Sequence, residues 1–476
     1  MSKKKATNGQ TAPAAPSAPD APAQRHLFGT DGIRGRANVH PMTPELALRL
    51  GRAITLVARR GKTRPPRIVI GKDTRLSGYM LETALAAGIC AMGGRVMLSG
   101  PIPTPAVANL TQSMRADAGV VISASHNPYA DNGIKIFGPD GFKLPDAEEV
   151  AIEQLLFGTE LDSNGHTGAQ IGRAERVGDA TGRYVVYVKS TFPRELTLDG
   201  LHVVVDAANG AAYRVAPAVF EELGASVTAL GCRPNGQNIN KNCGALHPDH
   251  VVNEVKKTKA AIGIALDGDA DRVIVVDEKG QIVDGDAVMA LCATRLLKNQ
   301  RLAKKTLVAT VMSNMGLERA LEAAGGKVLR TAVGDRYVVE EMRKSGYTLG
   351  GEQSGHLIFL DHATTGDGLV AALQVLAIMI AEGRSLSELA HVMQRVPQVL
   401  ESVTLSQRKP IEEMPALSRE MQLVEKKLGR EGRVLVRWSG TEPKLRLMLE
   451  GPDETVLKAM VAELLGAARR DLGDTA

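Results

Sequence analysis

A pattern of short apolar strands and amphipathic helices recurs three times along the chain. Residues 67–98, 202–230 and 306–330 each begin with a β-branched run, continue with apolar residues at helical spacing, and end in a second strand after glycine. Such segments are typical of a β–α–β unit. The units begin 135 and then 104 residues apart, well beyond the roughly 20–50 residues of a solenoid repeat. The pattern therefore predicts three related α/β domains.

The C-terminal part of the chain follows a different pattern. Two strands, at residues 433–438 and 444–451, flank a turn, and residues 454–470 place apolar side chains at helical spacing. Paired strands followed by a helix are typical of a small α+β domain. We therefore expect three α/β domains followed by a small α+β C-terminal domain.

The first 24 residues carry Lys, Ala and Pro without apolar periodicity. Such a segment buries too little apolar surface to offset the entropy of ordering. We predict a disordered tail, with an interaction arm as the less favoured alternative. The rest of the chain is predicted to form four domains with the bounds 25–175, 176–285, 286–395 and 396–476.

The composition excludes several classes of function. Lys and Arg number 58 against 53 Asp and Glu, and a net charge of +5 over 476 residues is not the basic footprint of a nucleic-acid binder. Aromatic residues make up only 3%, which argues against stacking on bases. No apolar run reaches the roughly 20 residues of a membrane helix. We expect neither nucleic acid nor membrane as a partner.

The number and spacing of the cysteines indicate the cellular compartment, and the number of glycines indicates the kind of turns. Cys90, Cys232, Cys243 and Cys292 show no CxxC spacing, and the N-terminus lacks an apolar signal-peptide core. This favours reduced thiols in the cytoplasm over a disulfide framework or a zinc site. Glycine numbers 49, above the usual share of about 7%, which indicates many tight turns near ligands.

The first segment with candidate chemistry is 119–128, where an apolar strand runs into Ser125 and His126 and a glycine-containing turn leads on to Lys135. A serine on a sharp turn at a strand end is exposed for attack, and its polar neighbours can orient it. An ordinary Asn-Pro turn capped by Ser123 or Ser125 has equal weight for this segment alone. A GxSxG elbow is absent, which disfavours an α/β-hydrolase triad.

Three alternating carboxylates, Asp267, Asp269 and Asp271, lie between two apolar strands. They can converge on one hard cation, and without a cation their like charges would repel. An EF-hand loop is rejected, because Glu278 falls at its position 12 but Arg272 occupies position 6, where glycine is needed. We predict Mg²⁺, which commonly accompanies phosphate, and calcium or zinc stay open as substitutes in vitro.

Glu352, Ser354 and His356 alternate in the glycine-rich segment 350–356. On one face of an extended loop they could bind sugar hydroxyls. A structural turn is the alternative for this segment.

The segment 437–443, followed by Arg446, combines two arginines with a Ser-Gly-Thr turn. Hydroxyls, backbone amides and arginines form a suitable phosphate cradle, although a hairpin with surface arginines is the alternative. A fifth segment, 29–35, carries Arg34 in a glycine-dense loop and is ambiguous by itself. Together the segments describe a nucleophilic serine, a cation, a polyol-binding loop and a phosphate clamp, one from each domain. This combination indicates phosphoryl transfer on a sugar phosphate.

These segments also carry a resemblance to a known family. The stretches 28–38, 71–82, 122–137, 267–273, 350–356 and 437–446 resemble the α-D-phosphohexomutase superfamily, and within it the bacterial members that act on glucosamine phosphates. The motifs occur in order and cover nearly the whole chain from about residue 26. The resemblance implies a heart-shaped, four-domain enzyme with its active site in the central cleft.

The resemblance also assigns roles to residues of this chain. Ser125 would be the phosphoserine, with His126 beside it among the catalytic residues. Asp267, Asp269 and Asp271 would bind Mg²⁺ together with the phosphate on Ser125. Arg34, Lys135 and Arg272 would surround that phosphate, with Lys135 a candidate proton shuttle. The sugar would be held by Glu352, Ser354 and His356, and the phosphate that does not react by Arg437, Ser439, Gly440, Thr441 and Arg446.

The activity implied is isomerisation of glucosamine 6-phosphate to glucosamine 1-phosphate through a glucosamine 1,6-bisphosphate, feeding UDP-N-acetylglucosamine and cell-wall synthesis. The alternative is the same mechanism on glucose or mannose phosphates. Activation would require a hexose 1,6-bisphosphate or prior phosphorylation of Ser125. The expected partner is a small sugar phosphate. The assembly is left open, with a homodimer as one possibility.

Two departures from the family pattern and two rival functions complete the sequence interpretation. Ala245 and Leu246 replace small hydroxyl residues in the loop 238–250, whose role stays open, and Ala270 stands where glycine is frequent. A metal-dependent phosphatase would release inorganic phosphate and would not need a remote clamp. A phosphosugar-binding sensor is disfavoured by the intact Ser125, the three carboxylates and Lys135.

Overall fold

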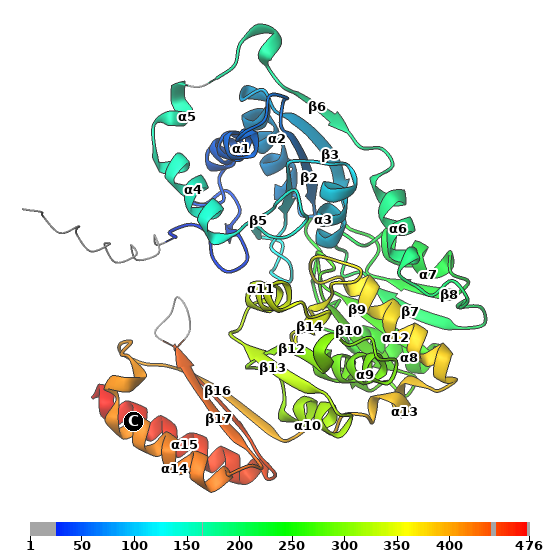
Figure 1. Ribbon diagram of the computed structural model, residues 1–476, viewed down its shortest axis with the longest axis vertical. Coiled ribbons are helices and arrows are strands. Elements are labelled where there is room, and N and C mark those ends of the chain that lie inside the picture. The colour runs from blue at the N-terminus through cyan, green and yellow to red at the C-terminus, as the bar shows by residue number, and fades with distance from the viewer. Residues whose placement is uncertain (1–24, 164, 439–443, 474–476) are drawn as a thin grey trace, which may run out of the picture.

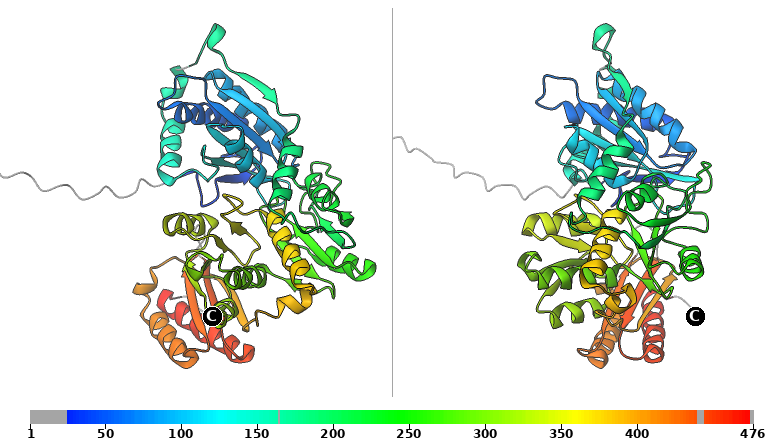
Figure 2. Two further views of the ribbon diagram at one scale, coloured as in Figure 1. Left: turned by 45° about the vertical axis from the view of Figure 1, so that its right-hand side comes forward. Right: turned by 90° about the vertical axis from the view of Figure 1, so that its right-hand side faces the viewer.

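The computed structural model describes residues 25–163, 165–438 and 444–473, so the predicted tail at 1–24 lies outside the described residues. Four sheets follow one another along the chain. The first and fourth sheets, with their helices, lie at opposite ends of the longest axis (Figures 1 and 2). In the described part of the chain, no helix combines the length and the apolar character needed to cross a membrane.

The first domain is built on a six-stranded sheet in the order β1-β5-β4-β2-β3-β6. Strands β4, β2, β3 and β6 are parallel to one another, and β5 is antiparallel to both of its neighbours, β4 and β1. The bounds of its strands are β1 Ile33–Arg36, β2 Arg67–Lys72, β3 Arg95–Pro101, β4 Ala118–Ile122, β5 Asp131–Phe137 and β6 Arg173–Arg176. The bounds of its helices are α1 Pro44–Arg59, α2 Ser77–Ala91, α3 Thr104–Ser113, α4 Asp146–Phe157 and α5 Glu160–Ser163, with a 3-10 turn η1 at Gly168–Gln170.

Alternation along β2 explains why helices cover both faces of this sheet. Ile68 and Ile70 belong to the core under α1, α2 and α4, whereas Val69 belongs to the core under α3. Successive side chains of a strand point to opposite faces, so a strand buried on both sides reads as a continuous apolar run. The β–α–β unit predicted at residues 67–98 is thus confirmed as β2–α2–β3.

The second domain has a five-stranded sheet in the order β11-β10-β9-β7-β8. The unit predicted at 202–230 is confirmed as β7–α7–β8, and the antiparallel pair β9 and β10 carries the acidic loop between its strands. The bounds are β7 His202–Asp206, β8 Ser226–Leu230, β9 Ile262–Leu266, β10 Val273–Asp277, β11 Ile282–Val283, α6 Ala180–Ser190, α7 Val215–Glu221 and α8 Asp249–Thr258.

The third domain has a four-stranded sheet in the order β13-β12-β14-β15. The unit predicted at 306–330 is confirmed as β12–α10–β13 with parallel strands. The strand bounds are β12 Thr306–Thr310, β13 Lys327–Thr331, β14 Leu349–Gly351 and β15 Leu357–Phe359. The helix bounds are α9 Gly285–Lys298, α10 Met315–Ala323, α11 Asp335–Ser345, α12 Gly368–Glu382 and α13 Leu386–Ala390, with the 3-10 turn η2 at Ala303–Lys305.

The fourth domain is a three-stranded antiparallel sheet in the order β16-β18-β17, packed against two helices. The predicted strands and helix are β17 Arg433–Trp438, β18 Lys444–Glu450 and α15 Glu454–Leu472. The sequence interpretation did not include β16 Gln398–Thr404, the 3-10 turn η3 Ile411–Glu413 or α14 Pro415–Leu428. Three α/β domains and a small α+β domain confirm the predicted fold class.

One hydrophobic cluster joins the first three domains, because the α3 face of the first sheet continues into residues of the second and third sheets. The fourth domain meets the third through polar contacts. Arg433 donates to the Ser313 carbonyl oxygen (2.6 Å) and pairs with Glu450 (2.5 Å), which accepts from the Met315 amide (3.2 Å). The first three domains therefore form one frame, to which the fourth is attached at its edge.

Candidate active site

The turn after β4 positions Ser125. Strand β4 is buried along its whole length, and the chain then enters a left-handed conformation at Ser125, with φ of 50°. The Ser125 amide donates to the Ser123 hydroxyl oxygen (3.0 Å), and Ser123 in turn donates to Asp73 (2.5 Å). Backbone strain of this kind persists only where neighbouring contacts fix it.

Two side chains that the sequence interpretation did not assign hold this turn from outside. Arg75, completely buried, donates to the carbonyl oxygens of Ser125 (3.2 Å) and Asn127 (2.5 Å). The Asn240 side-chain amide donates to the same two oxygens, at 2.8 and 3.0 Å. Asn240 belongs to the loop 238–250, so that loop supports the serine turn. Leu246 of the same loop is 54% exposed.

Ser125 is 1% exposed, and its hydroxyl donates to Asp267 Oδ2 at 2.6 Å. His126 Nδ1 lies 3.3 Å from the same hydroxyl. Burial, with the positive charges of Arg272 and Arg34, lowers the pKa of His126 to about 4. A neutral imidazole therefore sits beside the hydroxyl at pH 7.

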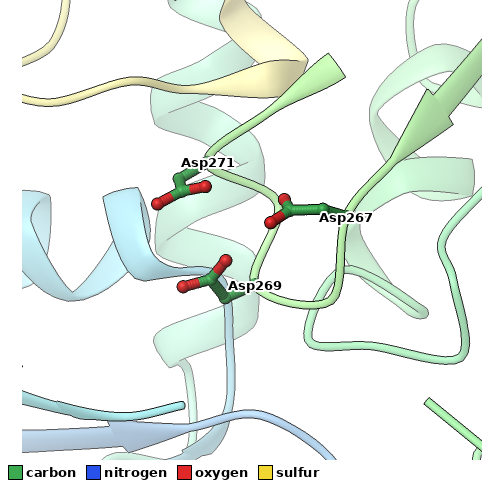
Figure 3. A group of neighbouring side chains, drawn as sticks. All are labelled: Asp267, Asp269 and Asp271. Atoms are coloured by element: carbon green, nitrogen blue, oxygen red, sulfur yellow. The ribbon is translucent and has the colours of Figure 1, made fainter. Parts of the chain in front are cut away.

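Asp267, Asp269 and Asp271 point toward one common space from the loop between β9 and β10 (Figure 3), and an oxygen of each lies within 4.8 Å of the others. The Oδ1 atoms of Asp269 and Asp271 are buried without a hydrogen-bond partner. Burial and the charges of the other two carboxylates raise the pKa of Asp267 well above its ordinary value. Three buried carboxylates that offer only oxygen ligands, two of these oxygens without a partner, fit a hard divalent cation. The loop makes its tight turn with Ala270 in a left-handed conformation (φ 58°), so a methyl group is tolerated there.

Lys135 supplies positive charge to this cluster from β5. Its Nζ lies 2.9 Å from Asp269 Oδ2, 3.2 Å from Asp271 Oδ2 and 3.2 Å from Asp31 Oδ2. Although burial opposes it, these carboxylates raise the pKa of Lys135 well above its ordinary value. Thr104, at the start of α3, also donates to Asp269 Oδ2 (2.7 Å). The first domain therefore completes the acidic loop of the second.

Asp31, in the glycine-dense loop before β1, links the first domain to the third. It pairs with Arg34 and with Lys143, and Lys143 pairs with Asp335 of α11 at 2.5 Å. Asp335 Oδ2 in turn lies 3.4 Å from His356 Nε2. The sequence interpretation placed Arg34 at the site but left out Asp31, Lys143 and Asp335, because only the folded chain brings them together.

The glycine-rich segment 350–356 is not the extended loop that the alternation of Glu352, Ser354 and His356 predicted. It is the tight turn between β14 and β15, closed by a bond from the Glu352 amide to the His356 carbonyl oxygen (2.9 Å). His356 is buried and faces inward, with Nδ1 3.7 Å from Asp271 Oδ2. Glu352 and Ser354 are half-buried, and their side chains contact each other at 3.4 Å. In this turn the His356 side chain is therefore buried, whereas those of Glu352 and Ser354 are partly accessible.

The turn also rests directly on the acidic loop. The Val273 amide donates to the Gly355 carbonyl oxygen (3.0 Å), and the Gly285 amide to the Gln353 carbonyl oxygen (3.2 Å). The Arg272 amide donates to Asp267 Oδ1 (3.2 Å), and its side chain lies 3.9 Å from Asp271. Serine turn, acidic loop and glycine-rich turn thus form one continuous site.

Arg437 and Arg446 lie on a separate sheet, directly opposite each other on β17 and β18. Burial and the charge of Arg446 lower the pKa of Arg437. Like charges opposite each other on neighbouring strands are destabilising unless an anion lies between them. Ser439, Gly440 and Thr441 lie outside the described residues.

Comparison with known proteins gives four family matches that follow one another along the chain. The phosphoglucomutase/phosphomannomutase models match in order: domain I at residues 25–162, domain II at 182–280, domain III at 284–396, each described as alpha/beta/alpha, and the C-terminal domain at 400–467. Two curated relatives are named phosphoglucosamine mutase. The protein from Sorangium cellulosum is 68% identical over 94% of both chains, and that from Anaeromyxobacter sp. is 63% identical over 98% of this chain and 99% of its own.

Solved structures share the fold. A phosphoglucomutase/phosphomannomutase family protein from Burkholderia thailandensis superposes with a TM-score of 0.78 at 26% identity, covering 94% of this chain and 97% of its own. N-acetylphosphoglucosamine mutase from Aspergillus fumigatus, solved with GlcNAc-6P and magnesium, superposes with a TM-score of 0.64 at 17% identity, covering 95% and 97%.

Proposed function

The chain belongs to the phosphoglucomutase/phosphomannomutase family, and we propose that it interconverts glucosamine 6-phosphate and glucosamine 1-phosphate. Curated relatives that are 60–68% identical over at least 94% of the chain are named phosphoglucosamine mutase. The observation within this chain that carries the proposal is the buried Ser125 hydroxyl, held 2.6 Å from the acidic loop. Its product would supply UDP-N-acetylglucosamine and, through it, cell-wall synthesis. We place the enzyme in the cytoplasm, and a homodimer is compatible with this role.

Ser125 is the proposed carrier of the phosphoryl group. In the first half-reaction the bond between phosphorus and Ser125 Oγ breaks, and a bond forms from phosphorus to the free hydroxyl oxygen of the sugar phosphate. The hydroxyl proton passes to a base in the cleft, and the neutral imidazole of His126 is our candidate, because the raised pKa of Lys135 keeps that side chain protonated. The resulting 1,6-bisphosphate turns round and returns its other phosphoryl group to Ser125. A hexose 1,6-bisphosphate, or prior phosphorylation of Ser125, would start the cycle.

Asp267, Asp269 and Asp271, with the phosphate on Ser125, are the proposed ligands of Mg²⁺. When bound, the cation would neutralise charge on the transferring phosphoryl group, the main demand of this chemistry. Arg34, Lys135 and Arg272 would add positive charge from the protein side, and the neutral His126 lies beside the serine. These residues stabilise the same charge from several domains at once.

Glu352 and Ser354 are the accessible polar groups of the glycine-rich turn, and we assign them to the sugar hydroxyls, with His356 behind them. Arg437 and Arg446, with Ser439, Gly440 and Thr441 between their strands, would hold the phosphate that does not react. Binding energy spent on this remote phosphate positions the reacting hydroxyl in line. The proposed domain bounds of 25–175, 176–285, 286–395 and 396–476 give each domain one part of the site.

The experiment that tests the substrate is the ratio of kcat/KM for glucosamine 1-phosphate and glucose 1-phosphate, measured with Mg²⁺ and a trace of hexose 1,6-bisphosphate. A large preference for the amino sugar is expected. Equal or reversed preference would assign the same chemistry to glucose or mannose phosphates. Release of inorganic phosphate in place of an isomer would identify a phosphatase.

The role of Ser125 is tested by the Ser125→Ala variant. We expect kcat to fall by at least about 10³-fold, because the covalent intermediate is lost, and mass spectrometry to find no phosphorylated residue after incubation with hexose 1,6-bisphosphate. Ser190→Ala, at an exposed serine of α6, is the control and should keep both activity and phosphorylation. Isomerisation by the Ser125→Ala protein at the original rate would overturn the mechanism.

A further inference from the structure

A second concave site lies in the first domain, at the end of the sheet opposite to Ser125. The serine turn follows the C-terminal end of β4, and Asp73 follows the C-terminal end of the parallel neighbour β2. The second cavity opens at the N-terminal ends of β2 and β3, near Arg67 and Arg95, and has a volume of about 640 Å³. The six residues of β2 separate the two places by roughly 20 Å at about 3.3 Å per residue.

Three arginines cross the floor of this cavity side by side. Arg67 of β2 is in register with Arg95 of β3, and Arg95 is in register with Arg173 of β6. Strands lie about 4.8 Å apart, so side chains in register on neighbouring strands share one face. Like charges in this arrangement are destabilising unless an anion balances them.

Three further basic side chains, Arg59, Lys62 and Arg64, line the walls. Lys62 and Arg64 share the single carboxylate of Asp117, at 2.7 Å each. Arg95 pairs with Glu175. Among the described residues, Arg59, Arg67 and Arg173 have no carboxylate within ion-pair distance. The hydrogen bond and charge of Arg95, together with the charges of Arg173 and Arg67, lower the pKa of the nearby Glu175 carboxylate. The cavity therefore holds a substantial excess of positive charge in a chain whose net charge is only +5.

The shape of the cavity is maintained by backbone contacts. The segment 166–173 forms one wall, because the His166 amide donates to the Ala91 carbonyl oxygen and the Gly172 amide to the Cys90 carbonyl oxygen, both at 2.9 Å. Arg59 is fixed by His166 Nε2 at 2.7 Å. A methyl group on Gly172 would lie 1.9 Å from the Gly94 carbonyl oxygen, so the wall fits closely against the floor. Pro65, Ala169 and Ile171 add apolar surface, and Ile171 is 55% exposed.

We propose that this cavity binds a small organic diphosphate, such as a nucleoside diphosphate or its ester. Guanidinium groups bind phosphate oxygens in pairs, and neighbouring arginines in register suit two linked phosphates better than one. The volume falls within the roughly 300–1,000 Å³ of small-molecule sites. The apolar wall gives the nucleoside part a surface to pack on. Since the cavity is remote from Ser125, its ligand binds without competing with the sugar phosphate.

The proposal is tested by isothermal titration of the full-length protein with UDP, ADP and inorganic pyrophosphate at low ionic strength. We expect binding that weakens as salt is added, with UDP or ADP tighter than pyrophosphate, and no displacement by glucosamine 6-phosphate. UDP binding much tighter than ADP would indicate that the base is recognised, and equal binding would indicate the diphosphate alone. Pyrophosphate binding as tightly as both would overturn the organic ligand.

The matched variants are Arg67→Gln/Arg173→Gln, in the cavity, and Arg384→Gln/Arg419→Gln, which removes the same charge from exposed positions in other domains. The cavity variant should bind UDP at least tenfold more weakly with kcat/KM unchanged, and the control should bind as the natural protein does. Arg173→Gln alone, on the exposed edge strand β6, is the second variant if the double one fails to fold. Equal binding in all variants would overturn the proposal. So would a change from dimer to monomer in sedimentation, because the cavity would then be an interface between copies.

Discussion

At the residue scale, the site concentrates buried charge around Lys135. The lysine is 1% exposed and contacts three carboxylates from two domains. Buried charges are costly unless they are paired and hydrogen-bonded. The lysine leaves two carboxylate oxygens of the acidic loop without partners, so its single positive charge does not balance the cluster.

This imbalance predicts that a divalent cation stabilises the folded protein. At a Mg²⁺ concentration 100-fold above its Kd, linkage adds about 2.7 kcal/mol to the free energy of unfolding. The measurement is the melting temperature with Mg²⁺ and with EDTA, where we expect a clear rise with the cation. Asp269→Asn should reduce the rise, whereas Glu254→Gln, at a surface ion pair, should keep it. The same melting temperature with Mg²⁺ and with EDTA would contradict the metal assignment.

The four cysteines are free and are predicted to be unreactive in the native protein. Burial raises the pKa of Cys292 to about 12, and burial with the nearby Asp206 charge raises those of Cys232 and Cys243 to about 11; burial also raises that of Cys90. At pH 8 a thiol of pKa 11 is thiolate in about one part in a thousand. Iodoacetamide should therefore label the native protein slowly at pH 8, faster as the pH rises, and all four thiols at once in guanidinium. Rapid labelling of any of them in the native protein would contradict this.

The sequence pattern singled out Ser125 and the three aspartates as separate candidates, because each segment follows an apolar strand, and the family resemblance then assigned them to one site. It could not assign Arg75 or Lys143. Arg75 is recognisable as part of a motif, but its role depends on two carbonyl oxygens about 50 residues away in the chain. Lys143 acts between Asp31 and Asp335, a contact that only the docking of two domains creates.

At the scale of elements, the turn between β14 and β15 is positioned by backbone contact with the acidic loop. Gly355 has a φ of 87°, and a Cβ there would lie 2.0 Å from the Val273 carbonyl oxygen. The side chains on this turn face the site only because the backbone approaches so closely.

Gly355→Ala should therefore displace the turn. We expect a loss of stability of about 3 kcal/mol from combined overlap and left-handed strain, with a raised KM for the sugar phosphate. Gly346→Ala, at the end of α11 with φ of 67° and no neighbouring atom near its Cβ, carries only the strain, about 1 kcal/mol. Urea unfolding of both variants measures the difference. Equal losses would show that the contact with Val273 contributes nothing.

The elements found by pattern are those with a buried face. The three β–α–β units and α15 show clear periodicity, because each packs against a large core. Strand β16 escaped detection because most of its seven residues are exposed or half-buried, and only Val399 is fully buried. Such an edge strand carries little alternation for a sequence to reveal.

At the scale of the whole molecule, the first and third domains are joined through α11. Arg336 is 5% exposed and binds Glu149 of α4 at 2.6 Å, in addition to Asp146. Arg343 lies about two turns further along α11. It binds Asp140 at 3.0 Å, and both side chains are about half exposed. The two contacts differ mainly in burial.

Arg336→Gln should loosen this junction by about 2 kcal/mol, because the buried Glu149 keeps its ion pair with Arg25 but loses its charged hydrogen bonds to Arg336. Arg343→Gln should cost about 1 kcal/mol or less, because its ion pair is exposed and its guanidinium also stacks on the Phe142 ring at 3.8 Å. Hydrogen exchange in α4 and α11 measures the local opening directly. Similar exchange in the two variants would show that the buried pair does not hold the domains together.

The contacts of Lys135 also impose an order on synthesis. Asp271 follows Lys135 by 136 residues, which a ribosome adds in roughly 7 to 27 seconds. Throughout that interval only Asp31, among the three carboxylate partners, has left the ribosome. Until the acidic loop emerges, the ammonium group can pair with Asp31 alone of these three carboxylates. The first domain therefore completes this set of ion pairs only after the second domain has been translated.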